Sequence, residues 1–248
     1  MNVRHEQTRS TPRQRRRQAN LDRILDAAMD LVVERGFDGL SMHELARRTD
    51  YTPGALYRYY AGKDALIAAL TTRLIESFGD VLARTAALLS DDRPLRRVLV
   101  ALFTYRDLAR HAPNRFGLLS MLLADPRLLV PDEDAAQSPL RAMSEVIGPL
   151  VEELGRARAA GALVDGDAGS AHEDALERAT ILFSAVHGLL QLRKQEARVA
   201  LVGDLDRLVT VSVRSLLLGW GADPDTLTRD LDAALAQGDL VAAAGGLP

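Results

Sequence analysis

Residues 41–66, SMHELARRTDYTPGALYRYYAGKDAL, constrain the fold most because they place two helix starts close together. Ser41 can accept a hydrogen bond from a backbone N–H of the first turn, and Glu44 can reach back to the backbone N–H of Ser41, as in a capping box. Thr52 is a good N-cap residue, and Pro53 follows at the first helical position, where its missing N–H costs nothing. The segment therefore predicts two short helices joined by a tight turn, the helix-turn-helix pattern.

The second of these helices carries side chains that suit contacts with DNA. Its front, Pro53-Gly54-Ala55, is slim, so the backbone could come close to base edges in a major groove. Leu56 and Tyr60 are four residues apart and share an inward face. Tyrosine hydroxyls and basic groups are common phosphate ligands, and those in or just after this helix are Tyr57, Arg58, Tyr59 and Lys63. The alternative is an ordinary helix pair with half-buried aromatic rings.

The N-terminal 20 residues are rich in arginine. They contain six Arg and a single acid, Glu6, and they show no apolar period before Leu21. Such a segment predicts a disordered basic arm over residues 1–19, which could follow the DNA backbone or enter the minor groove through Arg15, Arg16 and Arg17. The alternative is a solvated tail without a role.

Charge is distributed unevenly along the chain. Residues 1–65 hold 12 Lys and Arg against 9 Asp and Glu, whereas residues 66–248 hold 19 against 25. The net charge of −3 alone does not suggest a protein that binds DNA. Because binding depends on local neutralisation of phosphates, the positive N-terminal end is compatible with it.

Residues 21–66 resemble the DNA-binding domain of the TetR/AcrR family of bacterial transcriptional regulators, most specifically in TPGALYRYYAGKDAL. The resemblance implies that Pro53, Gly54 and Ala55 face base edges and that Arg58 lies at a position that often touches DNA. The phosphate contacts that it implies are Ser41, Thr52, Tyr57, Tyr59 and Lys63.

The segment departs from the family pattern at three positions. Tyr59 replaces the usual His, and Tyr60 replaces the usual Phe. Asp50 stands where the turn usually has Gly, so the turn geometry is less comfortable for this residue. The phosphate-binding chemistry is retained.

The apolar pattern predicts an all-α protein. From Asn20 to Arg35 the apolar residues are spaced by three and four, and Gly36 follows as a C-cap. We expect a helix-turn-helix head over residues 20–66, a larger helical regulatory and dimerisation domain over 67–237, and a flexible tail over 238–248. The later helices are predicted at residues 63–89, 95–109, 114–123, 140–160, 172–198, 204–218 and 225–236, with loops or a broken helix at 125–139 and a loop at 161–169.

The last two long helices carry apolar stripes that could face a second copy of the chain. The resemblance implies a four-helix homodimer interface there, although both stripes could equally pack against their own domain. The residues of this predicted interface are Leu182, Val186, Leu189, Leu205, Leu208, Val209, Ser212 and Leu216.

The resemblance also implies a pocket for a small-molecule effector among the middle helices. Apolar walls with a few polar anchors are typical of such pockets. The candidates by residue type are Phe103, Arg106, Phe116, Met121, Phe183, His187 and Gln191, and each could instead be an ordinary core or surface residue.

Other classes of protein find little support. The five His are scattered, there is no Cys, and no nucleotide-binding or nucleophile-elbow motif is present, so we expect no enzyme, no metal and no cofactor. The absence of Cys suits a reducing cytoplasm, and no stretch has the length and low charge of a membrane span.

The sequence thus predicts a cytoplasmic, homodimeric regulator that leaves a palindromic double-stranded DNA operator when a small molecule binds. Two alternatives stay open. The chain could be a helical DNA-binding dimer that is regulated by a protein partner or does not respond to a ligand, or it could act as an activator. An enclosed apolar cavity would favour the ligand sensor, and a filled core would favour the alternative.

Overall fold

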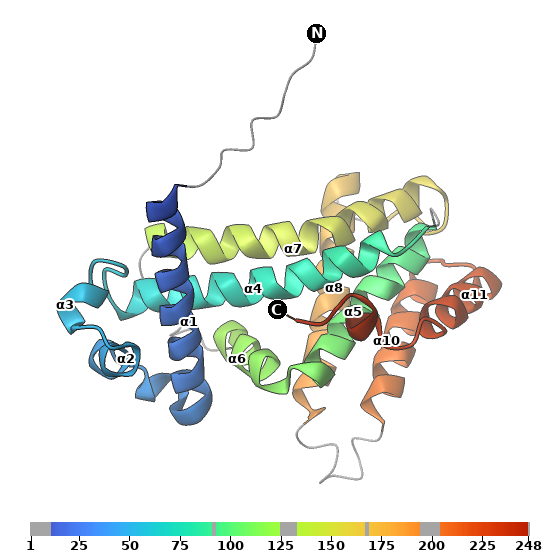
Figure 1. Cartoon of the computed structure of the whole chain (residues 1–248). Helices are drawn as coiled ribbons and strands as arrows, with labels where there is room; N and C mark the ends of the chain where they lie inside the picture. The colour runs from blue at the N-terminus through green and yellow to red at the C-terminus, as the bar shows by residue number, and fades with distance from the viewer. Residues whose placement is uncertain (1–10, 91–92, 125–132, 167–168, 194–203, 248) are drawn as a thin grey trace. The chain divides into compact units, whose positions relative to one another are not determined.

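The computed structural model describes residues 11–90, 93–124, 133–166, 169–193 and 204–247, and within them every regular element is a helix. The described residues up to Leu70, together with residues 133–136, form one compact unit, and the others form a second. The division falls within α4 (Lys63–Ala87), which supplies residues to both units (Figure 1).

The first unit is built from α1 (Pro12–Gly39), α2 (Met42–Thr49), α3 (Pro53–Leu56) and the start of α4. Its core consists of apolar side chains at helical spacing, which are Ile24, Ala28, Leu31, Leu45, Leu56 and Leu66, each almost fully buried. The predicted helix-turn-helix head is therefore present, and Leu66 at the start of α4 contributes to its core.

Gly36 interrupts α1 with φ 69° and ψ −179°, so the first regular helix ends there and a short helical piece continues to Gly39. Residues with a β-carbon rarely adopt this conformation, which is nearly specific to glycine. The predicted end of the first helix at Gly36 is confirmed.

The N-terminal start of α1 differs from the prediction. Residues 12–19, assigned to a disordered arm over 1–19, are helical and exposed along their whole length. The apolar period begins only at Leu21, so burial gives no signal for this part of the helix. Residues 1–10 lie outside the described residues.

The second unit is organised around α5 (Pro94–His111). Residues 102–109 are buried on all sides of this helix, as expected for a helix at the centre of a domain. It packs against α6 (Pro113–Ala124), α8 (Ala171–Gln191), α10 (Leu205–Gly219), α11 (Pro224–Leu235) and α12 (Leu240–Ala243).

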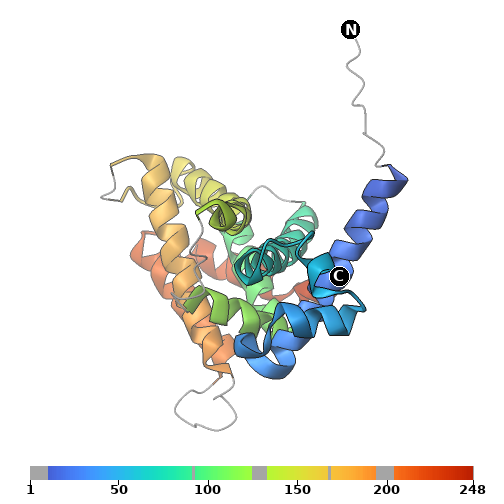
Figure 2. The ribbon, with the colours of Figure 1, turned by 90° about the vertical axis from the view of Figure 1, so that its left-hand side faces the viewer.

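Within this unit α4 and α7 (Glu133–Ala159) run side by side (Figures 1 and 2). A β-carbon at Gly79 of α4 would lie 2.6 Å from Cγ2 of Val146 in α7, so glycine is what permits this close approach. The helix α7 begins at Glu133 and continues through Pro139 and Pro149. The sequence predicted a loop or a broken helix over residues 125–139, so this prediction is wrong for residues 133–139. Residues 125–132 lie outside the described residues.

The C-terminal segment is packed rather than flexible. Asp239 caps α12 by accepting a hydrogen bond from the backbone N–H of Ala242, and Leu240 and Val241 are buried. The Nη2 of Arg84 donates to the backbone oxygen of Gly246 at 2.7 Å. The predicted flexible tail over 238–248 is therefore wrong for these residues.

Among the described residues, no helix combines enough length with enough apolar character to cross a membrane.

Candidate DNA-binding surface and interior cavity

Side-chain caps define the helix-turn-helix. The hydroxyl of Ser41 accepts a hydrogen bond from the backbone N–H of Glu44 at 3.2 Å, and the hydroxyl of Thr52 accepts one from Ala55 at the same distance. Between the two helices, Asp50 adopts φ 58° and ψ 31°, the left-handed conformation that the sequence led us to expect at this turn. An aspartate tolerates this conformation better than most residues with a β-carbon.

Ion pairs fix α2 to α1. Arg48 donates two hydrogen bonds to the carboxylate of Glu34, at 2.6 and 2.7 Å. Glu44 pairs with Arg47 and Arg35. The hydrogen bond from Arg47, followed by the charges of both arginines, holds the pKa of Glu44 below its usual value. These three arginines are therefore paired with carboxylates of the first unit.

The helix α3 and the turn that follows it present the predicted contact residues to solvent. Gly54 is exposed, and Pro53 and Ala55 are half-exposed. Tyr57 is 50% exposed and Arg58 is exposed, and among the described residues neither side chain makes a hydrogen bond or ion pair. Both are therefore available to a ligand.

The predicted inward face of α3 is confirmed, since Leu56 is fully buried and Tyr60 is 8% exposed. Lys63 lies exposed at the first residue of α4.

Tyr59 behaves differently from Tyr57, although both were predicted to hold phosphate. Its ring is half-buried, with its centroid 5.8 Å from that of Tyr51, and its hydroxyl accepts a hydrogen bond from Asn20 at 3.2 Å. The guanidinium of Arg23 lies 5.1 Å from the Tyr51 centroid. This cluster connects the end of α3 to α1, and sequence reasoning missed Asn20, Tyr51 and Arg23 as its members.

Arg13, Arg15, Arg16 and Arg17 lie on the exposed start of α1. Because this part is helical, the arginines project from a regular element in the same unit as α3.

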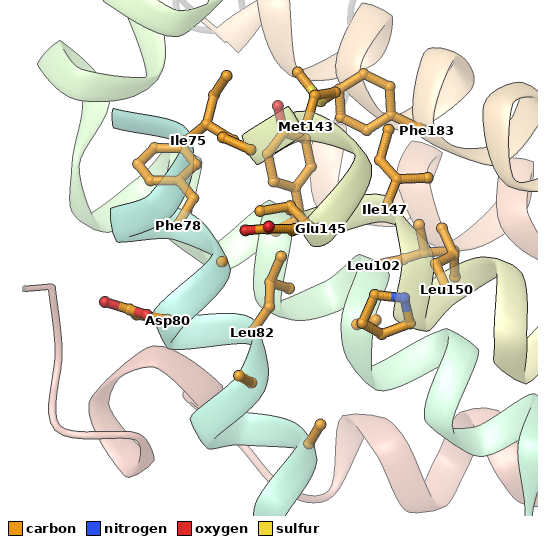
Figure 3. A pocket seen from close by; sticks show the side chains of 18 of the residues that line it. Ile75, Phe78, Asp80, Leu82, Leu102, Met143, Glu145, Ile147, Leu150 and Phe183 are labelled. Atoms are coloured by element: carbon orange, nitrogen blue, oxygen red, sulfur yellow. The ribbon is translucent and has the colours of Figure 1, made fainter. Parts of the chain in front are cut away.

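The second unit contains a cavity of about 340 Å³. Residues of α4, α5 and α7 form most of its wall, and Leu119 of α6 and Phe183 of α8 complete it. Figure 3 shows Phe78, Ile147 and Leu150 around this space, together with the carboxylate of Glu145; the carboxylate of Asp80, which also borders the cavity, extends away from these side chains. The volume lies within the range of small-molecule pockets, about 300–1,000 Å³.

Of the seven residues predicted to bind a ligand, only Phe183 lines this cavity. Phe103 is fully buried elsewhere, and Met121 and Gln191 are exposed. Arg106 pairs with buried Asp107 at 2.9 Å, and its guanidinium lies over the Phe103 ring. Residue type indicated apolar walls correctly but could not show which face of each helix borders the space.

The remaining two, Phe116 and His187, belong to an aromatic cluster around Tyr105. The Tyr105 hydroxyl and Nδ1 of His187 are 2.7 Å apart. Burial lowers the pKa of His187 and raises the pKa of Tyr105 far above its usual value, so both groups are neutral near pH 7. Tyr105 itself lines the cavity, which sequence reasoning missed.

The predicted dimer interface is divided between the chain's own core and a partly covered face. Leu182 and Val186 of α8 and Leu205 and Val209 of α10 are fully buried where these two helices pack together, so they have no surface left for a second copy. This corrects the prediction for those four residues. The half-buried members of the predicted set are Leu189, Leu208, Ser212 and Leu216.

Other residues of these helices are more exposed. Ile181 of α8 is 37% exposed and Val211 of α10 is 46% exposed. Ser184 and Gly188 share the exposed side of α8. The interface prediction named none of these four residues.

Two segments of the chain match known families. Residues 24–70 match the family described as bacterial regulatory proteins, tetR family, and residues 98–216 match a tetracyclin repressor-like C-terminal domain. The first match contains α2 and α3, and the second contains α6 and α8 and begins within α5.

Among curated proteins, the chain is 36% identical over 112 residues to the tetracycline repressor protein class A from transposon 1721 of Escherichia coli. That match covers 42% of this chain and 50% of that protein, so the chain spans about half the length of the curated relatives it matches.

Two solved structures share the fold. A protein of unknown function from Rhodococcus sp. RHA1 has a TM-score of 0.64 at 19% identity and covers 88% of this chain and 99% of its own. SmeT, the repressor of the Stenotrophomonas maltophilia multidrug efflux pump SmeDEF, has a TM-score of 0.58 at 22% identity, with 84% and 93% covered. With both domain families matched in the expected order, this chain belongs to the TetR family of bacterial regulatory proteins.

Proposed function

We propose that this chain is a DNA-binding transcriptional regulator, most specifically a homodimeric repressor that a small molecule releases from a palindromic operator. One observation carries the proposal: the turn directly after α3 exposes Tyr57 and Arg58, and Lys63 is exposed at the start of the next helix. Exposed tyrosine and basic side chains beside such a helix are suited to phosphate oxygens.

The proposed contacts divide into two kinds. Tyr57, Lys63 and the arginines at the start of α1 supply phosphate contacts, which set much of the affinity. Pro53-Gly54-Ala55 offers few side-chain hydrogen bonds, so base recognition uses close backbone approach and methyl contacts. In this assignment, Tyr59 positions α3 through Asn20. Because its hydroxyl accepts that hydrogen bond, its own O–H is left to donate to a phosphate oxygen.

Dimerisation is proposed through α8 and α10. Their exposed apolar residues Ile181 and Val211, with the half-buried Leu189 and Leu216, offer a face on which a second copy could pack. Two heads about one helical turn of DNA apart, about 34–36 Å, would read a palindrome.

The cavity supports the ligand-sensing part of the proposal, since a largely apolar space among α4, α5 and α7 favours a sensor over a filled core. The names of two relatives, a tetracycline repressor and the SmeT repressor of a multidrug efflux pump, support a repressor. The helix α4 carries Lys63 at its start and cavity residues such as Phe78 further along, so it links the two functions within one element. A ligand would lower operator affinity by its differential affinity for the two conformations.

The DNA-binding assignment can be tested with operators selected in vitro from random duplex DNA by the full chain. Lys63→Ala and Tyr57→Ala should weaken binding to every selected sequence, and Lys63→Ala should lower the slope of log affinity against log salt by about 1. Arg229→Ala, at an exposed position of α11, is the matched control. An unchanged salt slope for Lys63→Ala would remove Lys63 from the phosphate contacts.

The interface assignment can be tested by light scattering. Val211→Arg places a charge on an exposed apolar position of α10, so it should shift a dimer toward the monomer without disturbing the buried core. Val33→Arg, at an exposed position of α1 in the first unit, should leave the mass unchanged. A dimer that persists in the Val211 variant would place the interface elsewhere.

A further inference from the structure

The cavity of the second unit is bordered by acidic residues. Glu76 and Asp80 lie four residues apart on α4, so they share one face of that helix. Glu145 and Glu153 of α7 also line the cavity. Arg97 of α5 is the only cationic side chain among the described lining residues. The charged groups of this cavity are therefore predominantly negative.

Arg97 is not free to receive an anionic ligand. Its Nε donates to the carboxylate of Glu153 at 2.7 Å, and Arg156 donates to the same carboxylate at 2.9 Å. Glu153 is mostly buried in this arrangement, with 17% of its side chain exposed. A ligand carboxylate or phosphate would have to displace Glu153 from its two arginines.

Three carboxylates remain. Among the described residues, Glu76 and Asp80 make no ion pair. Glu145 pairs with Arg141 at 2.8 Å, but both side chains are exposed, and exposed pairs of this kind contribute little and exchange readily. These three carboxylates can approach a cation without first losing a buried partner.

The aromatic part of the cavity wall is neutral. Phe78 and Phe183 pack against the Tyr105 ring, with centroids 6.3 and 5.5 Å from it. Burial keeps the Tyr105 hydroxyl protonated and His187 uncharged, so this part of the wall has neither an anion nor a cation to offer. It suits an apolar ligand body.

We infer that the cavity binds an amphiphilic cation, with its apolar body against Phe78, Tyr105 and Phe183 and its cationic group near Glu145, while Glu76 and Asp80 add negative charge at the border of the cavity. This inference rests on the proposed ligand-sensing function and specifies the chemical class of the ligand. An anionic amphiphile of the same shape is excluded by charge, and a neutral one gains nothing from the three carboxylates.

The test uses three probes of matched chain length: decyltrimethylammonium, decanoate and N,N-dimethyldecanamide. Each is titrated calorimetrically into the full-length protein at low ionic strength and below its micellar concentration. The cation should bind most tightly, and its affinity should fall as salt is added because the carboxylates are partly exposed. Binding of decanoate or of the amide that equals or exceeds binding of the cation overturns the inference, as does the absence of binding by all three.

Variants that remove negative charge distinguish electrostatic attraction of the cation from the fit of its apolar body in the cavity. Asp80→Asn with Glu145→Gln should weaken cation binding roughly fivefold and leave amide binding unchanged. Glu152→Gln, at an exposed position of α7 outside the cavity, is the matched control and should have no effect. Equal loss in the control, or no loss in the double variant, contradicts a role for these carboxylates. Ala101→Phe, which fills the cavity from α5, should abolish binding of the cation, with circular dichroism to confirm folding.

Release of the selected operator distinguishes the inference from the function on which it rests. If decanoate or the amide releases the DNA and the cation does not, ligand sensing stands and the cationic class is wrong. If none of the three binds while the protein still binds its operator, DNA binding stands and the cationic inference is overturned.

Discussion

The two units of this chain hold their charged side chains in different environments. In the first unit, Arg48 and Glu34 pair at the surface, where water surrounds both groups. In the second unit, Asp174 and Arg178 pair at 3.0 Å with more than nine-tenths of each side chain buried, and Asp107 is fully buried against Arg106.

This difference indicates which substitutions should destabilise each unit. An exposed ion pair contributes about 0–1 kcal/mol, so the head depends on its caps, its small core and its special backbone positions. A buried pair adds little net stability, but removing one partner leaves an uncompensated charge. We therefore expect charge substitutions to damage the second unit and backbone substitutions to damage the first.

The largest expected effect is at Arg178. Its Nε pairs with Asp174, its Nη2 donates to the backbone oxygen of Val164 at 2.8 Å, and its guanidinium lies over the Trp220 ring. Arg178→Met should lower the free energy of unfolding by about 3–5 kcal/mol, measured by urea unfolding with the fluorescence of Trp220, the only tryptophan.

Two further variants sharpen that result. Arg141→Ala breaks an exposed pair and should leave the free energy of unfolding nearly unchanged. Asp174→Leu combined with Arg178→Met should recover part of the loss, because no buried charge remains. A single variant as stable as the Arg141 control would show that burial of the pair carries no special cost.

A backbone substitution in the head should have an intermediate effect. Gly36→Ala should destabilise the first unit by about 1–3 kcal/mol, because φ 69° with ψ −179° is strained for any residue with a β-carbon. Hydrogen exchange of peptides from α1 and α2 would measure the loss. Gly54→Ala, at an exposed glycine of α3 without a positive φ, is the control for loss of glycine alone. Equal protection in both variants would contradict the strain argument.

The smallest expected effect concerns pH. Burial lowers the pKa of His187 from its ordinary value of 6.5, so the unfolded chain binds a proton more readily than the folded one. Stability from this group is present above about pH 6.5 and declines as pH falls toward the folded pKa, by at most about 1.4 kcal/mol per pH unit.

Comparing unfolding of the wild type and of His187→Gln at several pH values isolates this contribution. The variant should lose less stability between pH 7.5 and the acid range, since glutamine does not titrate. His43→Gln, at an exposed position of α2, is the control for the loss of a histidine. Parallel curves for the wild type and the His187 variant would show that the histidine is protonated equally in both states.

Local patterns predicted the head well because its determinants lie within a few residues of one another. The caps at Ser41 and Thr52, the turn at Asp50 and the buried pair Leu56 and Tyr60 all appear as expected. The sequence could not show that Tyr57 is exposed while Tyr59 is hydrogen-bonded within the head. That hydrogen bond comes from Asn20, which is 39 residues away from Tyr59 in the sequence. The basic start of α1 was assigned to disorder because exposed helix leaves no apolar period.

The sequence by itself determined the helical class, most helix positions and the capped turn, because spacing and capping are local properties of the chain. Only the tertiary structure decided the cavity, which needs α4, α5 and α7 together, and which faces of α8 and α10 are buried against each other. It also placed Leu240 and Val241 in the core instead of a flexible tail. Apolar periodicity shows that a helix buries a face, but the partner that covers this face is chosen by packing between segments distant in the sequence.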